Sequence, residues 1–378
     1  MDKFTRLREF MDETFAGLEI TGVDLIVWQE HKEIFRHQAG YMDLENKIPP
    51  APGALYNIYS ATKIITCVAA LQLAEQGRLQ LTDPVYKYLP EYENMQVRYG
   101  TWSYSPAKNK MTVADLFSMT AGLHYEGECA SLRKLHEDTE GDFSTREFAA
   151  ALAKEPLLFE PGTGWNYGFC HEVLGAIIEI VSGETFENYL QKNIFAPLGM
   201  KDSSFYLSGD RAERVAPQYS YNAGTGAVTK ISHISLAAFS GSRFASGGGG
   251  LIMPAEDYIL FADALACGGT GANGAKIISK NSINLMSKNR LKSKAMEDYR
   301  NFGTMPGYGY GLGCGVVYDA AECMSLRPEG TFFWGGLGGV QNIIDPVNKL
   351  SAYLSMHLIA GPKHLFWPQM LNILYSAI

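Results

Sequence analysis

The order in which strand and helix patterns follow each other constrains the fold of this 378-residue chain most. Residues 22–28 and 32–39 are typical of a β-hairpin. Strand patterns return near the C-terminal end at 308–317, 331–334, 340–345 and 350–357. Helical patterns fill most of the middle and recur at the end, at 113–119, 145–153, 171–181, 186–193, 255–266, 279–288 and 363–375. This order predicts an α/β (α+β) fold, in which helices flank one antiparallel sheet and a mostly helical lobe is inserted.

The same order predicts two regions within one catalytic domain. We expect residues 1–65 and 300–378 to form the α/β sheet region and residues 66–299 to form the mostly helical region. Short strand patterns at 218–221 and 227–231 lie inside the helical region, so these boundaries are approximate. With 46% hydrophobic residues, the chain is long enough for one large core or two associated cores.

The net charge and the cysteine spacing argue against several classes of binding partner. The net charge of −8, without a basic stripe, argues against nucleic acid and mildly against a strongly anionic substrate. Residues 1–13 predict a charged amphipathic helix rather than a signal peptide, and no apolar run approaches a membrane span, so we expect a cytoplasmic protein without membrane association. Six cysteines without Cys-x-x-Cys spacing favour reduced thiols and no metal or cofactor. The oligomeric state stays open.

The strongest chemical motif is Ser60-Ala61-Thr62-Lys63, at the start of a predicted helix. Positions i and i+3 share a helix face, so the Ser60 hydroxyl and the Lys63 amine are expected to lie close together. The positive end of the helix favours negative charge near Ser60, and Lys63 is placed to take or relay the hydroxyl proton. So short a pattern also arises by chance, as an N-capping serine followed by a surface lysine.

Two later segments supply groups that the same chemistry needs. Tyr167 follows the turn-rich residues 160–166, and a nearby ammonium would favour its phenolate. The segment Trp334-Gly335-Gly336 ends a strand pattern, and its glycines would let a substrate backbone or acyl group approach closely. The alternative interpretations are a half-buried aromatic side chain and a glycine-rich hairpin bend.

Together, Ser60-x-x-Lys63, Tyr167 after Pro-Gly-Thr and Trp334-Gly-Gly resemble the motifs of the serine β-lactamase and penicillin-binding-protein superfamily. The most similar branch is that of the class C β-lactamase-related hydrolases, including esterases of the family VIII carboxylesterase type. Further segments that are similar to this family lie at 111–123, 195–200 and 245–257. The resemblance covers roughly residues 20–360 and implies a β-lactamase-like fold.

The resemblance also implies roles for individual residues. Ser60 would be the acylated nucleophile, and Lys63 and Tyr167 would handle its proton as a coupled pair, with the first base undecided. The backbone N–H groups of Ser60 and Leu337 would form the oxyanion hole. The residues implied to bind the substrate or its oxyanion are Trp334, Gly335, Gly336, Leu337 and Phe169.

Two departures from the family pattern bear on the substrate. Where β-lactamases of this branch have Lys-Thr-Gly, the chain has Trp334-Gly335-Gly336, so a cation near the tyrosine is replaced by a large apolar indole with one N–H donor. The asparagine of a Tyr-x-Asn motif is replaced by Phe169. Both changes make the site more apolar, which favours a carboxylesterase acting on small or apolar acyl esters.

Three alternatives use the same residues. A β-lactamase or D-amino-acid peptidase would need a cation from elsewhere in the fold for its substrate carboxylate. An acyltransferase differs only in its acceptor. A non-catalytic penicillin-binding-like protein would explain the altered motifs, but not the retention of Ser60, Lys63 and Tyr167 together. The expected partner of an enzyme of this kind is a small-molecule ester, amide or lactam.

Smaller expectations concern the surroundings of the cleft. The polar stretches 92–110 and 126–143 are either solvated loops or loops that overhang the cleft, with Tyr99, Trp102 and Tyr104 as candidate contacts to an acyl chain. His171, four residues after Tyr167, is expected to be partly exposed at a helix start.

Overall fold

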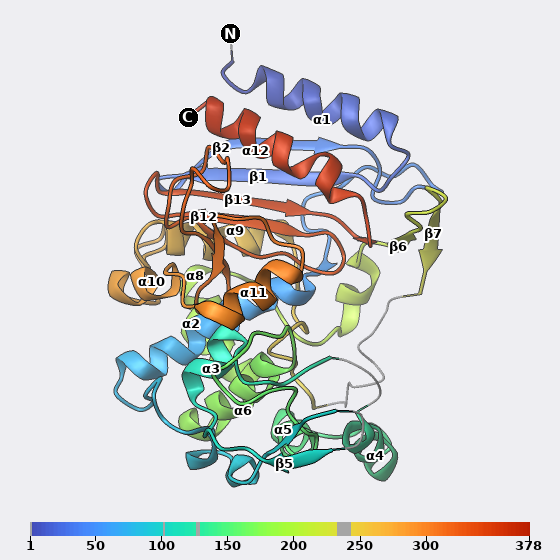
Figure 1. Ribbon diagram of the computed structural model, residues 1–378. Helices are drawn as coiled ribbons and strands as arrows, with labels where there is room; N and C mark the ends of the chain where they lie inside the picture. Colours follow the sequence, from blue (N-terminus) through green and yellow to red (C-terminus); the bar gives the residue numbers. More distant parts are fainter. Residues whose placement is uncertain (1, 101–102, 126–128, 233–242) are drawn as a thin grey trace.

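The two ends of the chain form one seven-stranded antiparallel sheet in the computed structural model, which describes residues 2–100, 103–125, 129–232 and 243–378 (Figure 1). Its strand order is β2-β1-β13-β12-β11-β10-β9. In chain order these strands are β1 Val23–Gln29, β2 Lys32–Ala39, β9 Tyr308–Tyr310, β10 Gly315–Val317, β11 Phe332–Phe333, β12 Gln341–Asp345 and β13 Leu350–Ser355. The predicted antiparallel sheet with flanking helices is thus confirmed.

Helices cover both faces of this sheet. The terminal helices α1 (Thr5–Gly17) and α12 (Trp367–Ser376) lie together on one face, and α9 (Ala255–Ala266) packs against β1, β12 and β13 on the other (Figure 1). Side chains of β1 alternate between the faces: Leu25 packs with the terminal helices, whereas Ile26 joins the larger core. The helix predicted at 255–266 is confirmed with its bounds.

One strand prediction was wrong. Residues 308–317 form two strands, because the chain turns back at Gly311–Cys314 and β9 pairs with β10 as a hairpin. The tight packing of this turn requires glycine: a Cβ at Gly311 would lie 1.9 Å from the carbonyl oxygen of Met286. The pattern of β-favouring residues on both sides hid the turn.

The larger core surrounds a helix that is buried from Thr62 to Leu73, α2 (Thr62–Glu75). It packs against α6 (Cys170–Ser182), which in turn contacts α3 (Val113–Ser118) and α5 (Thr145–Leu152). A helix that is apolar on most sides can only be stable inside the protein. The remaining helices are α4 Ala130–Thr139, α7 Phe186–Leu190, α8 Ala196–Leu198, α10 Lys280–Met286 and α11 Ser293–Asn301.

Three small sheets complete the fold. Their strands are β3 Tyr56–Asn57 with β8 Ile252–Met253, β4 Gln96–Arg98 with β5 Tyr104–Pro106, and β6 Gln218–Tyr221 with β7 Val228–Ile231 and β14 Leu358–Ile359. The short strands predicted at 218–221 and 227–231 are therefore present. The pair β3–β8 matters most for the site, because it holds the chain just before α2 beside the glycine-rich residues 247–250.

No helix in the described part of the chain combines the length and apolarity needed to cross a bilayer. The division at residues 65 and 300 stays a prediction. In the structure, α9 belongs by sequence to the 66–299 region and by packing to the sheet.

We expect the free energy of unfolding to fall by on the order of 2 kcal/mol on Arg36→Met. The Arg36 guanidinium joins Asp24, 2.5 Å away on β1, to Glu256, 2.6 Å away at the start of α9. Asp24 is only 2% exposed, so it would remain as a buried carboxylate without its cation. Urea denaturation measures the change.

Lys349→Met is the matched control, because the salt bridge of Lys349 to Glu30 is solvent-exposed and is expected to leave the urea midpoint unchanged. Equal midpoints for Arg36→Met and Lys349→Met would show that the Arg36 network does not hold α9 to the sheet.

Candidate functional site

Ser60 lies in a single 3₁₀ turn, Tyr59–Ala61, that runs directly into α2. Before it, the N–H of Ile58 donates to the carbonyl of Leu251 at 3.0 Å, which ties the residue after β3 to the residue before β8. Tyr59 has a φ of +46°, a strained backbone conformation for a residue with a side chain. The turn therefore fixes Ser60 at the N-terminal end of a buried helix, where developing negative charge is favoured.

Lys63 is the buried cation of the site, with 1% of its surface exposed. Its Nζ donates to three oxygen atoms: Ser60 Oγ at 3.3 Å, the Gly248 carbonyl at 2.5 Å and Tyr125 Oη at 3.3 Å. An ammonium has three N–H donors, so each donor of Lys63 has one acceptor. The motif's i, i+3 spacing thus gives the predicted contact between hydroxyl and amine.

The ring of Tyr167 contacts the same Lys63 ammonium. Lys63 Nζ is 4.6 Å from the centroid of the Tyr167 ring, in a cation–π arrangement, and the Tyr167 hydroxyl accepts a hydrogen bond of 3.1 Å from Trp334 Nε1. Gly168 allows this placement, because a Cβ there would lie 2.3 Å from the Leu123 carbonyl oxygen. The one N–H donor of the Trp334 indole is thus bonded to the tyrosine.

The segment after β11 brings the predicted substrate-binding residues to Ser60. A Cβ at Gly336 would lie 2.3 Å from the Ile58 carbonyl oxygen, so only glycine lets this segment pass directly beside the turn that carries Ser60. Gly335 is similarly confined by the Gln341 side chain. Leu337 is 52% exposed and lines the same hollows as Ser60. The oxyanion role of its N–H stays a prediction.

Two hollows meet at Ser60, and Tyr167 and Leu337 line both of them. The first, which we call the aromatic cavity, has a volume of about 350 Å³. It is lined by Tyr59, Ser60, Tyr125, Phe148, Tyr167, Phe169, Glu172, Phe244, Ser246, Gly248, Gly249 and Leu337. The second, the indole hollow, has a volume of about 290 Å³ and is lined by Ser60, Tyr167, Phe302, Phe333, Trp334, Gly335, Gly336, Leu337, Gln341 and Lys363.

Phe169, which replaces the asparagine of the family pattern, belongs to the wall of the aromatic cavity. Its ring centroid lies 4.4 Å from that of Tyr125 and 5.5 Å from that of Phe148, both edge-on. Only 6% of its surface is exposed. The side of the site that it forms is therefore apolar, as predicted.

Sequence reasoning missed several polar side chains that line these hollows, among them Tyr125, Glu172 and Lys363. Burial raises the pKa of Tyr125 well above its ordinary value, so its phenol is neutral at neutral pH and can accept from Lys63. A carboxyl directly before the apolar run 173–178 of α6 was the available signal for Glu172. Lys363 reaches the indole hollow from beyond β14, which no local pattern reveals.

The prediction for His171 was wrong. Its side chain is fully buried in the first turn of α6, and its Nε2 lies 3.1 Å from Cys67 Sγ on α2. Burial, together with the nearby Lys63 charge, holds the pKa of His171 well below its usual range, so the ring is neutral. The residue packs α6 against α2 behind the site.

The predicted overhanging loops contribute little to the two hollows. No described residue of 92–110 lines either of them, and the Tyr99 hydroxyl donates instead to Glu160 at 2.8 Å. Trp102 and residues 126–128 lie outside the described residues. Tyr125, directly before the second stretch, is the neighbour that reaches the cavity.

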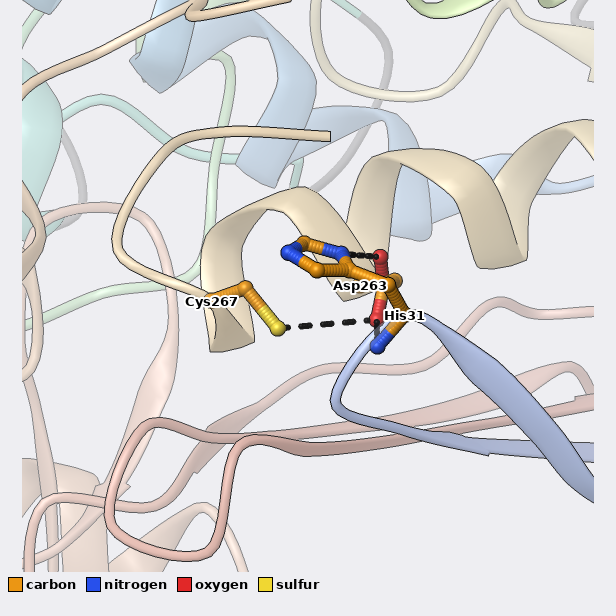
Figure 2. Close-up of side chains that lie close together, drawn as sticks. All are labelled: His31, Asp263 and Cys267. Carbon is orange, nitrogen blue, oxygen red and sulfur yellow. Dashed lines mark hydrogen bonds and ion pairs between the residues drawn. The ribbon is translucent and has the colours of Figure 1, made fainter. Parts of the chain in front are cut away.

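A separate cluster of metal-ligand types, His31, Asp263 and Cys267, lies between the β1–β2 turn and α9 (Figure 2). His31 Nδ1 is 2.7 Å from Asp263 Oδ2, which is a hydrogen-bond distance and shorter than the ~3.3 Å that separates two ligands around tetrahedral zinc. Burial, followed by the charge of Asp263, raises the pKa of Cys267 to about 12. These contacts are those of a structural tie between turn and helix, and the absence of a metal stays a prediction.

Family and sequence comparisons match known proteins over most of the length of this chain. Residues 7–358 match the family model described as Beta-lactamase. Protein Rv1367c of Mycobacterium tuberculosis is 29% identical over 365 residues, which cover 93% of this chain and 88% of that protein. Esterase EstB of Burkholderia gladioli is 28% identical over 373 residues, which cover 92% of this chain and 89% of that protein.

The fold has solved counterparts. The structure of EstCE1, described as a hydrolase with promiscuous acyltransferase activity, superposes with a TM-score of 0.82 at 23% identity. The superposition covers 99% of this chain and 98% of that one. At this level of identity the likeness establishes the fold, and the sheet with an inserted helical lobe is shared along its whole length.

The two tyrosines around Lys63 give a matched pair of variants. We expect Tyr167→Phe to lower kcat for an activated p-nitrophenyl ester by about 10²- to 10⁴-fold, the usual loss on removing a general acid-base. Tyr125→Phe is expected to cost less than about tenfold, because Lys63 keeps its bonds to Ser60 and Gly248. Steady-state kinetics with both variants make the comparison.

An equal or larger loss for Tyr125→Phe would move the proton-handling role from Tyr167 to Tyr125. A loss below about threefold for Tyr167→Phe would reduce that residue to packing against Trp334.

Proposed function

The chain belongs to the Beta-lactamase family, and from this premise we propose that it is a serine hydrolase that forms an acyl-enzyme on Ser60. We further propose that it is a carboxylesterase acting on small or apolar acyl esters. The observation that carries the proposal is the Ser60 hydroxyl, 3.3 Å from a buried lysine, at the junction of an aromatic cavity and a second hollow.

In the proposed reaction, Ser60 Oγ attacks the ester carbonyl while its proton passes to the Lys63–Tyr167 pair. One member of the pair must first be deprotonated, because an ammonium that donates to three oxygens cannot accept a proton. The oxyanion would be stabilised by the N–H groups of Ser60 and Leu337. The pair then protonates the departing alcohol, and a water molecule releases the acid and restores Ser60.

Two hollows on either side of Ser60 match the two halves of an ester. The aromatic cavity is suited to the acyl group, because its walls include Phe148, Phe169 and Phe244. The indole hollow, with Trp334 as one wall, is suited to an uncharged alcohol. The similarity to Esterase EstB supports an ester as the substrate, whichever hollow holds each half.

Acyl transfer is the neighbouring alternative, because replacing the water by a second alcohol changes only the acceptor. The name of EstCE1 records both activities for that protein. A non-catalytic binding protein is disfavoured by the intact contacts around Lys63, which such a protein would not need. The cytoplasmic location expected from the sequence stays a prediction.

The first test compares wild type with Ser60→Ala on p-nitrophenyl butanoate and on a chromogenic cephalosporin. We expect ester turnover with a Ser60-dependent mass increase of the intact protein, and little cleavage of the lactam. Ester cleavage at the wild-type rate in Ser60→Ala would refute the assignment. A preference for the cephalosporin would establish a lactamase or peptidase instead.

One observation favours an anionic substrate as a second candidate. Lys363 lines the indole hollow together with Ser60, so the cation that the Trp334 position lacks is supplied at its rim. A carboxylate held there would lie on the leaving-group side of Ser60. A β-lactamase or peptidase activity would use this lysine.

Two variants separate these readings. We expect Trp334→Lys to raise the ratio of carboxylated-lactam to neutral-ester cleavage, because it adds a cation beside Tyr167, and Lys363→Met to leave ester cleavage unchanged. The ratio of kcat/KM values measures both. A loss of ester cleavage in Lys363→Met, or an unchanged ratio in Trp334→Lys, would contradict the proposed selection.

A further inference from the structure

The aromatic cavity contains one feature that an apolar acyl group does not explain, the carboxyl of Glu172. The side chain is 3% exposed, yet the residue lines the cavity. Its Oε1 accepts a hydrogen bond of 3.0 Å from Ser246, which lines the cavity as well. Oε2 is buried and has no hydrogen-bond partner among the described residues.

A carboxyl oxygen in this position destabilises the folded protein. Burial without a hydrogen bond costs on the order of 1–3 kcal/mol for a polar group, and more for a charged one. Desolvation accordingly raises the pKa of Glu172, against the opposing effects of Lys63 and of nearby hydrogen-bond donors. Leucine or methionine would fill the same space without this cost, so packing alone does not account for the residue.

The carboxyl is held next to the catalytic lysine by Gly248. A Cβ at Gly248 would lie 2.2 Å from Glu172 Oε1 and 2.7 Å from Oε2, so the carboxyl packs directly on this glycine. The carbonyl of the same glycine accepts from Lys63 Nζ at 2.5 Å, and Lys63 in turn contacts Ser60 Oγ at 3.3 Å. In this chain of contacts Lys63 and Gly248 connect the carboxyl to Ser60, where a bound acyl chain would begin.

We infer that Glu172 determines substrate specificity in the aromatic cavity. Its carboxyl would form a hydrogen bond with a hydroxyl group on a short acyl chain bound to Ser60. This inference rests on the proposed esterase function. A hydroxyl both donates and accepts, so it can pair with the carboxyl whether this group is ionised or protonated. An ammonium on the substrate would match only the ionised form and would be repelled by Lys63. The substrate class is therefore the short-chain hydroxyacyl ester.

The test uses pairs of p-nitrophenyl esters in which a hydroxyl replaces a methyl group of similar size. The pairs are 2-hydroxybutanoate with 2-methylbutanoate and 3-hydroxybutanoate with 3-methylbutanoate, using both enantiomers of each chiral ester. Each kcat/KM is divided by the rate constant for hydroxide-catalysed hydrolysis of the same ester, because the hydroxyl also changes intrinsic reactivity. We expect wild type to prefer at least one hydroxyacyl ester by about tenfold, the value of one hydrogen bond to a carboxyl.

The variants assign that preference to Glu172. In Glu172→Leu the preference is expected to disappear, with the methyl esters cleaved as well as or better than before. Glu172→Gln, which keeps the shape and both hydrogen-bonding functions, is expected to retain a reduced preference. The matched control is Glu179→Gln on the same helix, because Glu179 accepts from the Phe186 N–H at 2.9 Å and does not line the cavity; its preference should equal that of wild type.

The outcomes separate the inference from the function on which it rests. Ser60-dependent cleavage of methyl esters at equal or higher normalised rates than every hydroxy ester would overturn the inference and leave the esterase intact. A wild-type preference that survives in Glu172→Leu would also overturn it. If Glu172→Leu does not fold, the wild-type ratio and Glu172→Gln decide in its place. Absence of any Ser60-dependent ester cleavage would overturn both proposals.

Discussion

The buried ammonium of Lys63 is the interaction on which the site depends. A desolvated cation is tolerated only where oxygen atoms replace its water shell, and here three segments that are remote in sequence supply them: Ser60, Tyr125 and Gly248. None of these acceptors carries a full charge opposite to the lysine. The hydrogen bonds that replace the water shell of the ammonium therefore also hold Ser60, Tyr125 and Gly248 next to one another. The same contacts stabilise the buried cation and set the geometry of the site.

Glycine makes this convergence possible at the level of the backbone. Gly336 passes beside Ile58, Gly168 packs on Leu123, and Gly248 packs on the Glu172 carboxyl, each at a distance that a Cβ would not permit. Each contact joins two of the segments that surround Ser60. Close contacts of glycine backbone thus bring the walls of the two hollows together, and aromatic rings line the space between them.

Local patterns predicted what is local in the structure. The helix at 255–266 and the contact between Ser60 and Lys63 both follow from i, i+3 and i+4 periodicity within a few residues. The 308–317 hairpin was missed although Gly311 and Gly313 mark its turn, because β-favouring residues on both sides resemble one continuous strand. Tyr125 and Lys363 were missed for a different reason, because only the assembled fold brings them to the hollows beside Ser60. The family resemblance identified Tyr167 and Trp334 as neighbours, which the residues alone did not.

The replacement of a lysine by Trp334 changes the electrostatics of the site more than its geometry. The indole N–H still holds the Tyr167 hydroxyl at 3.1 Å, but it brings no unit charge to the indole hollow. Opposite charges 4 Å apart attract by about 4 kcal/mol at an effective dielectric constant of 20. Compared with a lysine at this position, an anionic substrate loses an attraction of that order, which Lys363 in the lining of the same hollow would have to replace, whereas a neutral ester loses none. In the aromatic cavity the Glu172 carboxyl offers an anion no attraction either, so we expect charge to disfavour carboxylated acyl groups there.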